Sequence, residues 1–408
     1  MKSDVKVAVI GGGIVGASVL YWLTKMGWND AVLIERRELT SGSTWHAAGN
    51  TTYFGPYPKM TKLFAGSIRT YLQAEKESGQ SVSFHQTGSL RLAVNQSELN
   101  LFHKYASLYD DLGIPFEVLT PERAKELHPL LNVSGISGAA HTPTDGYVDP
   151  TGATNALARA ARKLGASIER FCPVETVEYK DGGWKLTTAN GIIRAKNVVV
   201  ANSFWAREML EPLGVNIPIY ATQHQEIITQ PIPLLKTLDY ELPAWRDSYV
   251  SGSVRQEGHG VLAGVYEANP KFWALDGIPR DFREELFPSE LDRIMPNLER
   301  LIERMPSFGE AGIKVVNNGP MCWTPDGLPL LGPVKNHEGL WLATGFNVGI
   351  GTGGGSGEFL AHWMTQGKPP FDLKIVHADR FNNNMKVEDA LNSIRRSYAA
   401  GYQLPDKI

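Results

Sequence analysis

The sequence has few cysteines, no long apolar run and almost no charge imbalance, and each lack excludes a class of protein. Its 408 residues contain two cysteines, Cys172 and Cys322, in no metal-like spacing, so we expect no disulfide scaffold and no metal site. No apolar stretch approaches the roughly 20 residues of a transmembrane helix, and the short N-terminal apolar run lacks the layout of a signal peptide. The net charge of −3 predicts no nucleic acid partner. We expect a protein of the reducing cytoplasm.

Glycine, in contrast, is abundant: the chain has 41 glycines, and they cluster towards its two ends. Residues 5–10 read as a buried strand, residues 11–16 as a glycine-rich turn and residues 17–26 as a helix. A second short apolar run, residues 31–34, ends on Glu35. This order predicts the βαβ unit that binds a dinucleotide.

Each part of the predicted unit has a physical reason. Gly11 allows a tight turn, Gly13 lets the backbone approach a pyrophosphate, and Gly16 lets the helix pack closely on the strand. The helix N-terminus offers free N–H groups to phosphates. Glu35 can accept both ribose hydroxyls and disfavours a 2′-phosphate, so FAD or NAD is expected rather than NADP. The expected cofactor contacts in this region also include Ile14, Val15 and Arg36.

The stretch after Glu35 changes from small polar residues to very small ones, which predicts a loop that enters a helix against a flat surface. Ser43 and Thr44 can cap that helix and donate to phosphate. Ala47, Ala48 and Gly49 permit the close approach of a ring system. Residues 43–49 resemble the flavin-attachment segment of the dimethylglycine and sarcosine dehydrogenases, within the D-amino-acid-oxidase-like FAD family.

This resemblance implies that His46, which follows Trp45, bonds covalently to the 8α-methyl group of FAD. The chemistry is reasonable because a neutral imidazole is a nucleophile. By composition alone, a single histidine near a helix start is more often a capping or packed residue. Another branch of the family attaches its flavin through a late cysteine, but Cys322 does not align with it, and we interpret Cys322 as a packed thiol.

A second glycine-rich loop follows a predicted strand at residues 340–344 and opens a helix that runs to Met364. Its N–H groups and dipole would stabilise the negative charge that appears at the pyrimidine edge of a reduced flavin. The resemblance assigns these contacts to Gly349, Ile350, Gly351 and Thr352, and the expected site includes Gly345. It also implies cofactor contacts at Val174, Ala201 and Trp205. Ser203 replaces a glycine of the family pattern.

The predicted fold is α/β, with a Rossmann-type FAD-binding domain and a discontinuous substrate domain built on an antiparallel sheet. We expect residues 1–84, 145–215 and 311–380 to form the FAD-binding domain. Residues 85–144 and 216–310 would form the substrate domain, and residues 381–408 a polar, partly helical C-terminal tail. In the similar dehydrogenases a folate-binding half follows, so the resemblance covers only half of those longer chains.

His224 and Tyr266 are the predicted catalytic residues, because both are expected on strands that face the flavin and the family has His and Tyr there. A structural hydrogen bond for His224 and a core position for Tyr266 remain alternatives. Tyr53, Trp273 and Arg255 are the candidates that shape the pocket or hold a substrate carboxylate. Amine oxidation needs a base of modest strength and a cage for the amine.

The resemblance implies FAD-dependent oxidative demethylation of a small N-methylated amino acid, such as dimethylglycine or sarcosine, by hydride transfer to flavin N5. Leu262 aligns with a lysine that promotes reaction with oxygen in one branch, which favours a dehydrogenase that passes electrons to a protein or quinone. Alternatives are an oxidase of a cyclic or other amino acid that uses O2, and a non-catalytic FAD-carrying subunit of a larger complex. We expect no membrane span, and an oligomer is compatible with the sequence.

Overall fold

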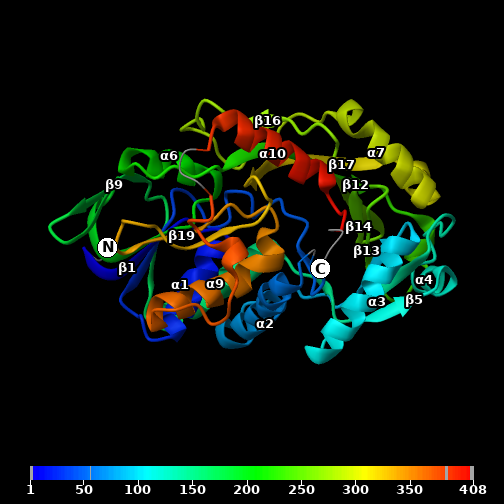
Figure 1. The fold of residues 1–408 in the computed structure, drawn as a ribbon, viewed down its shortest axis with the longest axis horizontal. Coiled ribbons are helices and arrows are strands. Elements are labelled where there is room, and N and C mark those ends of the chain that lie inside the picture. The colour runs from blue at the N-terminus through cyan, green and yellow to red at the C-terminus, as the bar shows by residue number, and fades with distance from the viewer. Residues whose placement is uncertain (1–2, 56, 382–384, 405–408) are drawn as a thin grey trace.

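In the computed structural model, which describes residues 3–55, 57–381 and 385–404, the chain folds around two sheets (Figure 1). The first sheet has the order β18-β19-β11-β1-β2-β8, with β1 parallel to both β2 and β11. The hairpin of β9 and β10 extends from β11. The strands are β1 (Asp4–Ile10), β2 (Ala31–Ile34), β8 (Ser167–Glu169), β9 (Val174–Lys180), β10 (Gly183–Thr188), β11 (Gly191–Val200), β18 (Leu330–Pro333) and β19 (Leu340–Thr344).

The helices that cover this sheet pack closely because glycines line their contacts. They are α1 (Ile14–Lys25), α2 (Thr61–Ser78), α5 (Pro150–Lys163) and α9 (Gly349–Gln366). A Cβ atom added at Gly355 of α9 would lie 2.1 Å from the carbonyl oxygen of Leu63 in α2. One added at Gly357 would lie 2.6 Å from the backbone of Ser18 in α1. The late glycines of the chain therefore hold α9 against both neighbouring helices.

The second sheet is mostly antiparallel and has the order β16-β12-β15-β14-β13-β4-β6-β5, with β17 paired to β12. Its strands are β4 (Ser89–Ala93), β5 (Glu117–Leu119), β6 (Gly138–Thr142), β12 (Tyr220–Thr229), β13 (Ala244–Asp247), β14 (Gly252–Glu257), β15 (Gly260–Val265), β16 (Phe272–Trp273) and β17 (Ile313–Trp323). The expected division gives residues 311–323 to the first domain. The structure differs, because β17 pairs with β12 along its length.

The remaining helices and strands complete the fold. They are β3 (Asn50–Thr51), β7 (Gly146–Tyr147), α3 (Gln96–Asp111), α4 (Pro121–Leu127), α6 (Ala206–Leu210), α7 (Leu291–Arg304), α8 (Pro306–Ala311) and α10 (Val387–Ala400). Figure 1 shows α10 lying along the second sheet near β12 and β17. Ala390, Ile394 and Tyr398 recur every four residues and pack with Trp323 of β17. Within the expected tail, residues 387–400 thus form a packed helix. No helix in the described part of the chain is long and apolar enough to cross a bilayer.

Candidate active site

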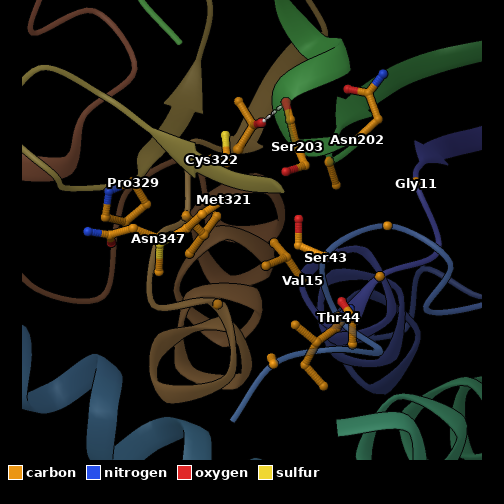
Figure 2. Close-up of a pocket in the computed structure, with 18 of the residues that line it drawn as sticks. Gly11, Val15, Ser43, Thr44, Asn202, Ser203, Met321, Cys322, Pro329 and Asn347 are labelled. Atoms are coloured by element: carbon orange, nitrogen blue, oxygen red, sulfur yellow. Dashed lines mark hydrogen bonds between the residues drawn. The ribbon is translucent and has the colours of Figure 1, made fainter. Parts of the chain in front are cut away.

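A cavity of about 1180 Å³ extends from the β1–α1 turn to the face of the second sheet. Figure 2 shows Gly11, Val15 and Thr44 on one side of it and Met321 and Asn347 on the other. Its wall also includes Glu226, Gly264 and Tyr266, so both expected domains contribute to it. A cavity of this size between two domains, lined by a few polar groups, is typical of a cofactor and substrate site.

The β1–α1 turn has the backbone that the glycine pattern predicts. Gly11 has a φ of +112°, and a Cβ atom there would lie 2.5 Å from the carbonyl oxygen of Ala201. The first N–H of α1, from Ile14, donates to the hydroxyl of Thr44 at 3.2 Å. Thr44 therefore caps α1 and not a helix of its own. The expected helix after the Ser43–Thr44 cap does not form, because residues 43–46 form turns and Ser43 donates to the carbonyl of Pro320 at 2.8 Å.

The carboxylate of Glu35 is buried at the end of β2, where the sequence predicts a ribose contact. Its Oε2 accepts the N–H of Gly12 at 2.7 Å, and its Oε1 accepts the N–H of Arg37 at 2.8 Å. Burial raises the pKa of Glu35, while the hydrogen bond from Gly12 opposes that rise. The acid and the glycine turn thus form one connected unit. Together they fit the ribose and pyrophosphate of a dinucleotide.

His46 lies in the cavity wall, with its imidazole against the backbone of β17. A Cβ atom added at Gly319 would lie 2.5 Å from Cε1 of His46, so only glycine fits beneath this ring. The Nε2 atom is buried and has no hydrogen-bond partner among the described residues. Burial lowers the pKa of His46 to about 4, so the imidazole is neutral at pH 7. A neutral, unpartnered nitrogen in the wall of the cavity fits a flavin tether.

The helix α9 directs its N-terminus to the same cavity, as the second glycine loop predicts. Its first four residues, from Gly349 to Thr352, all line the cavity. Ser203, on the neighbouring loop, has a φ of +56°, and its carbonyl accepts the hydroxyl of Thr344 at 2.9 Å. A glycine, which the resemblance implies at this position, would adopt this left-handed conformation without strain.

Most of the predicted cofactor residues line the cavity. They are Gly11, Gly13, Ile14, Val15, Glu35, Arg36, Ser43, Thr44, His46, Ala47, Gly49, Val174, Ala201, Trp205, Gly349, Ile350, Gly351 and Thr352. Gly16, Trp45 and Gly345 do not line it. A Cβ atom at Gly16 would lie 1.9 Å from the carbonyl oxygen of Gly11. Trp45 packs edge-on against His46. Gly345 has a φ of +77°. These three residues lie next to the cavity lining and support its shape.

A row of residues crosses the second sheet on the face that lines the cavity. Strand pairing aligns Arg91 of β4 with Arg246 of β13, and Arg246 with Ser253 of β14. It continues from Ser253 to Gly264 of β15 and from Gly264 to Glu226 of β12. All five line the cavity. Two cations thus lie at one end of this polar row and an acid at the other. Between them, Gly264 leaves a gap in the row because it has no side chain, and we call this the glycine gap.

The two arginines differ in what they bind. Arg91 donates to the carbonyl of Tyr402, and burial, followed by repulsion from Arg246, lowers its pKa to about 10. Arg246 is 8% exposed, and its side chain forms no hydrogen bond or ion pair with the described part of the chain. The buried Asp145 interacts with this charge, but its oxygens accept hydrogen bonds from Thr52, Tyr53 and Ser89. A buried guanidinium that lines a cavity without a hydrogen-bonded carboxylate is suited to hold an anionic ligand.

The opposite end of the row carries groups suited to proton transfer. Burial raises the pKa of Glu226 to about 7, and its Oε2 has no partner among the residues described. Burial, followed by the charges of His46 and Arg293, lowers the pKa of His224 to about 3, so this imidazole is neutral at pH 7. The ring of Tyr266 lies 4.7 Å from that of His224. The structure therefore brings the two predicted catalytic residues together.

Three residues proposed for substrate contact lie elsewhere. Arg255 donates from Nε to the carbonyl of Ala48 at 2.7 Å and forms an ion pair with Glu257 at 2.6 Å, so its charge is already paired. Trp273 packs on Phe282 with ring centroids 4.4 Å apart, and the backbone N–H of Tyr53 donates to Asp145 at 2.7 Å. None of the three lines the cavity.

The site also contains residues that sequence reasoning missed, because no local motif marks them. They are Arg91, Arg246, Glu226, Trp323 and Tyr402. A basic residue inside an alternating apolar strand is the only signal for Arg91 and Arg246.

Within the described residues, no group of three or more His, Cys, Asp or Glu is placed to hold a metal ion. Cys322 lines the cavity, and burial raises the pKa of its thiol to about 12, as expected for a packed thiol.

Comparison with known proteins agrees with this geometry. The family model described as FAD dependent oxidoreductase matches residues 6–363. Mitochondrial dimethylglycine dehydrogenase from Mus musculus is 41% identical over 97% of this chain and 46% of its own length. Mitochondrial sarcosine dehydrogenase from the same organism is 35% identical over 99% of this chain and 44% of its own. The chain thus spans about half the length of these curated relatives.

Two solved structures have the same fold. L-proline dehydrogenase from P. horikoshii has a TM-score of 0.82 and 27% identity, and the match covers 93% of this chain and 98% of that one. Glycine oxidase from Geobacillus kaustophilus has a TM-score of 0.74 and 23% identity, with 93% and 100% covered. The predicted combination of a Rossmann-type sheet with a second, mostly antiparallel sheet is confirmed.

Proposed function

Because the chain belongs to the family of FAD-dependent oxidoreductases, we propose that it oxidatively demethylates a small N-methylated amino acid such as dimethylglycine or sarcosine. The observation that carries this proposal is the polar row across the second sheet. Its cationic end suits a carboxylate, and its acidic end, beside His224, suits an amine. Arg246 and Glu226 lie three strand spacings apart, or about 14 Å between backbones, which long side chains reduce to the size of an amino acid.

The cofactor would lie between the β1–α1 turn and the N-terminus of α9. Glu35 would hold its ribose, and the N–H groups of the glycine turn its pyrophosphate. The N-terminus of α9 would face the pyrimidine edge, and His46 would form the covalent tether. When bound there, FAD supplies an acceptor for the hydride that leaves the carbon next to the amine nitrogen.

The protein's own residues would bind the substrate and remove its proton. Arg246 holds the carboxylate, and the rings of Tyr266, Trp323 and Tyr402 surround the methylated nitrogen. Neutral His224 accepts the ammonium proton, which frees the nitrogen lone pair that assists hydride loss. Water then hydrolyses the iminium to formaldehyde and the demethylated amine.

The electron acceptor would be a protein or quinone and not O2. Two observations support a dehydrogenase: Leu262 is buried within β15, and the described lining of the cavity contains no lysine. The free, buried cysteines suit a reducing compartment such as the cytoplasm. A second candidate activity is the oxidation of a cyclic secondary amino acid, which the similarity to an L-proline dehydrogenase structure favours. A non-catalytic FAD-carrying subunit is the third possibility.

An anaerobic bleaching screen separates these functions. FAD-loaded protein is mixed with dimethylglycine, sarcosine, proline or glycine, and the flavin absorbance is followed while released formaldehyde is assayed. Bleaching with stoichiometric formaldehyde supports demethylation. Bleaching by proline alone, without formaldehyde, supports the second activity, and no bleaching by any amine supports the carrier subunit.

Acid precipitation tests the tether separately. Yellow colour that stays with the precipitated wild-type protein and leaves with His46→Ala supports a covalent bond at His46. Colour lost to the supernatant from both proteins contradicts the tether and leaves the demethylation proposal standing.

A further inference from the structure

A chain of hydrogen bonds leads from His224 away from the cavity and into the C-terminal helix. The Nδ1 atom of His224 lies 3.0 Å from the hydroxyl oxygen of Tyr398. That hydroxyl lies 2.8 Å from Oε2 of Glu267 and 3.4 Å from the backbone carbonyl of Gln223. Tyr398 is fully buried on α10. Its ring packs against Tyr266 at 5.1 Å and Trp323 at 5.2 Å, so its position is fixed.

The acceptors around Tyr398 determine the direction of this chain. Glu267 is 2% exposed, and burial raises its pKa, while the charge of Arg293 at 3.4 Å and the hydrogen bond from Tyr398 oppose that rise and stabilise the carboxylate. A carboxylate and a carbonyl can only accept, and a phenol has a single proton to donate. The Tyr398 proton therefore goes to Glu267, and the Tyr398 oxygen accepts a hydrogen bond from His224.

We propose that Tyr398 is a positioning residue that keeps the proton of His224 on Nδ1 and leaves the Nε2 lone pair free as the base. The inference rests on the proposed function, in which His224 accepts the ammonium proton. On its other side, Nε2 of His224 faces the glycine gap in the polar row, because a Cβ atom at Gly264 would lie 3.4 Å from it. The hydrogen bond at one ring nitrogen thus sets the chemistry of the other.

This role makes α10 part of the active centre, although the helix lies beyond residues 6–363, which the family model matches. The side chain of Tyr398 does not line the cavity, so its effect on the reaction would act through His224. Other titratable groups also influence this imidazole. Those that face it or share its surroundings are His46, Glu226, Tyr266, Glu267 and Arg293.

Tyr398→Phe tests the proposal, because it removes the hydroxyl and keeps the packed ring. In ¹⁵N-histidine NMR spectra, with His224 assigned by loss of its signal in His224→Gln, we expect an Nδ1–H tautomer in the wild-type protein. In Tyr398→Phe the signal should shift towards the Nε2–H tautomer. The rate constant of flavin bleaching should fall about 10- to 100-fold, less than the 10²- to 10⁴-fold typical of losing a general base. Substrate affinity should change little.

Tyr249→Phe is the matched control, because this exposed tyrosine donates to Glu303 on the surface and should leave both readouts unchanged. A wild-type Nε2–H tautomer, or an unchanged tautomer and rate in Tyr398→Phe, overturns the proposal. Thermal unfolding of both variants shows whether the fold is retained. If no amine bleaches the wild-type flavin, the proposed function fails, while the NMR measurement still decides whether Tyr398 controls the tautomer.

Discussion

Replacing Arg246 by methionine should remove most of the preference for a substrate that carries a carboxylate. Arg246 is buried in the cavity wall, and it has no ion-pair partner within the described chain, so the bound carboxylate would be its counter-ion. Methionine keeps the apolar stem of the side chain and removes the charge. Its thioether also adapts to the shape of the space.

The size of the effect follows from the surroundings of Arg246. Truncating one partner of a buried charge pair costs about 2–5 kcal/mol, which corresponds to roughly 30- to 4,000-fold in affinity. Arg91 stands beside Arg246 in the strand register and retains part of the attraction. We therefore expect the lower half of this range, a loss of about 30- to 300-fold in affinity for dimethylglycine.

The assay compares dimethylglycine with its neutral amide. The apparent dissociation constant is obtained for each from the concentration dependence of anaerobic flavin bleaching. The wild-type protein should prefer the acid, and Arg246→Met should bind both compounds with similar affinity. Arg255→Met is the matched control, since Arg255 is buried in the same sheet but its charge is satisfied by Ala48 and Glu257. It should keep the preference for the acid.

Three results would refute this reasoning. Equal discrimination in the wild-type protein and in Arg246→Met would show that another group holds the carboxylate. Loss of discrimination in Arg255→Met alone would return that role to Arg255. A melting temperature of Arg246→Met that falls far below the wild-type value would show that the charge of Arg246 mainly stabilises the buried Asp145.

Three further predictions concern other parts of the cavity. The pKa of Glu226 is about 7 in the folded protein, above the ordinary 4.5, so ionisation of this residue destabilises the fold as the pH rises. In urea denaturation, the unfolding free energy of Glu226→Gln should be higher than that of the wild-type protein at pH 8.5 and similar to it near pH 4.5. Gly319→Ala should displace the imidazole of His46 and lower the FAD retained after acid precipitation, whereas Gly183→Ala, with ordinary contacts, should not; equal retention would contradict the tether geometry. Gly16→Ala places a Cβ atom 1.9 Å from a backbone carbonyl of the glycine loop, and should lower both the melting temperature and the FAD content; normal values of both would contradict the close packing.

The dinucleotide half of the site could be predicted from the sequence because its determinants are local. The turn at Gly11, the acid at Glu35 and the loop before Gly349 each lie within one strand–turn–helix unit, where spacing alone indicates the geometry. Thr44 shows the limit of such reasoning. Its hydroxyl was expected to cap its own segment, and it caps α1 because the fold brings the two segments together.

The substrate half could not be predicted in the same way, because it depends on strand register. Arg91 and Arg246 become neighbours through the parallel pairing of β4 with β13, two strands far apart in the sequence. A one-residue shift of that register would turn either side chain to the other face of the sheet. The tail that contains Tyr398 was expected to be partly helical, but no pattern in the sequence indicates which surface α10 covers.

The glycines that hold α9 against its neighbours also have an electrostatic consequence. Cβ atoms at Gly354 and Gly355 would lie 2.8 Å from the backbone of Ser67 and 2.1 Å from that of Leu63, so only glycine lets α9 pack this closely on α2. The close packing holds the positive end of α9 in one position. A flavin bound as proposed would then meet a dipole that is already in place, and its reduction would need little reorganisation of this helix.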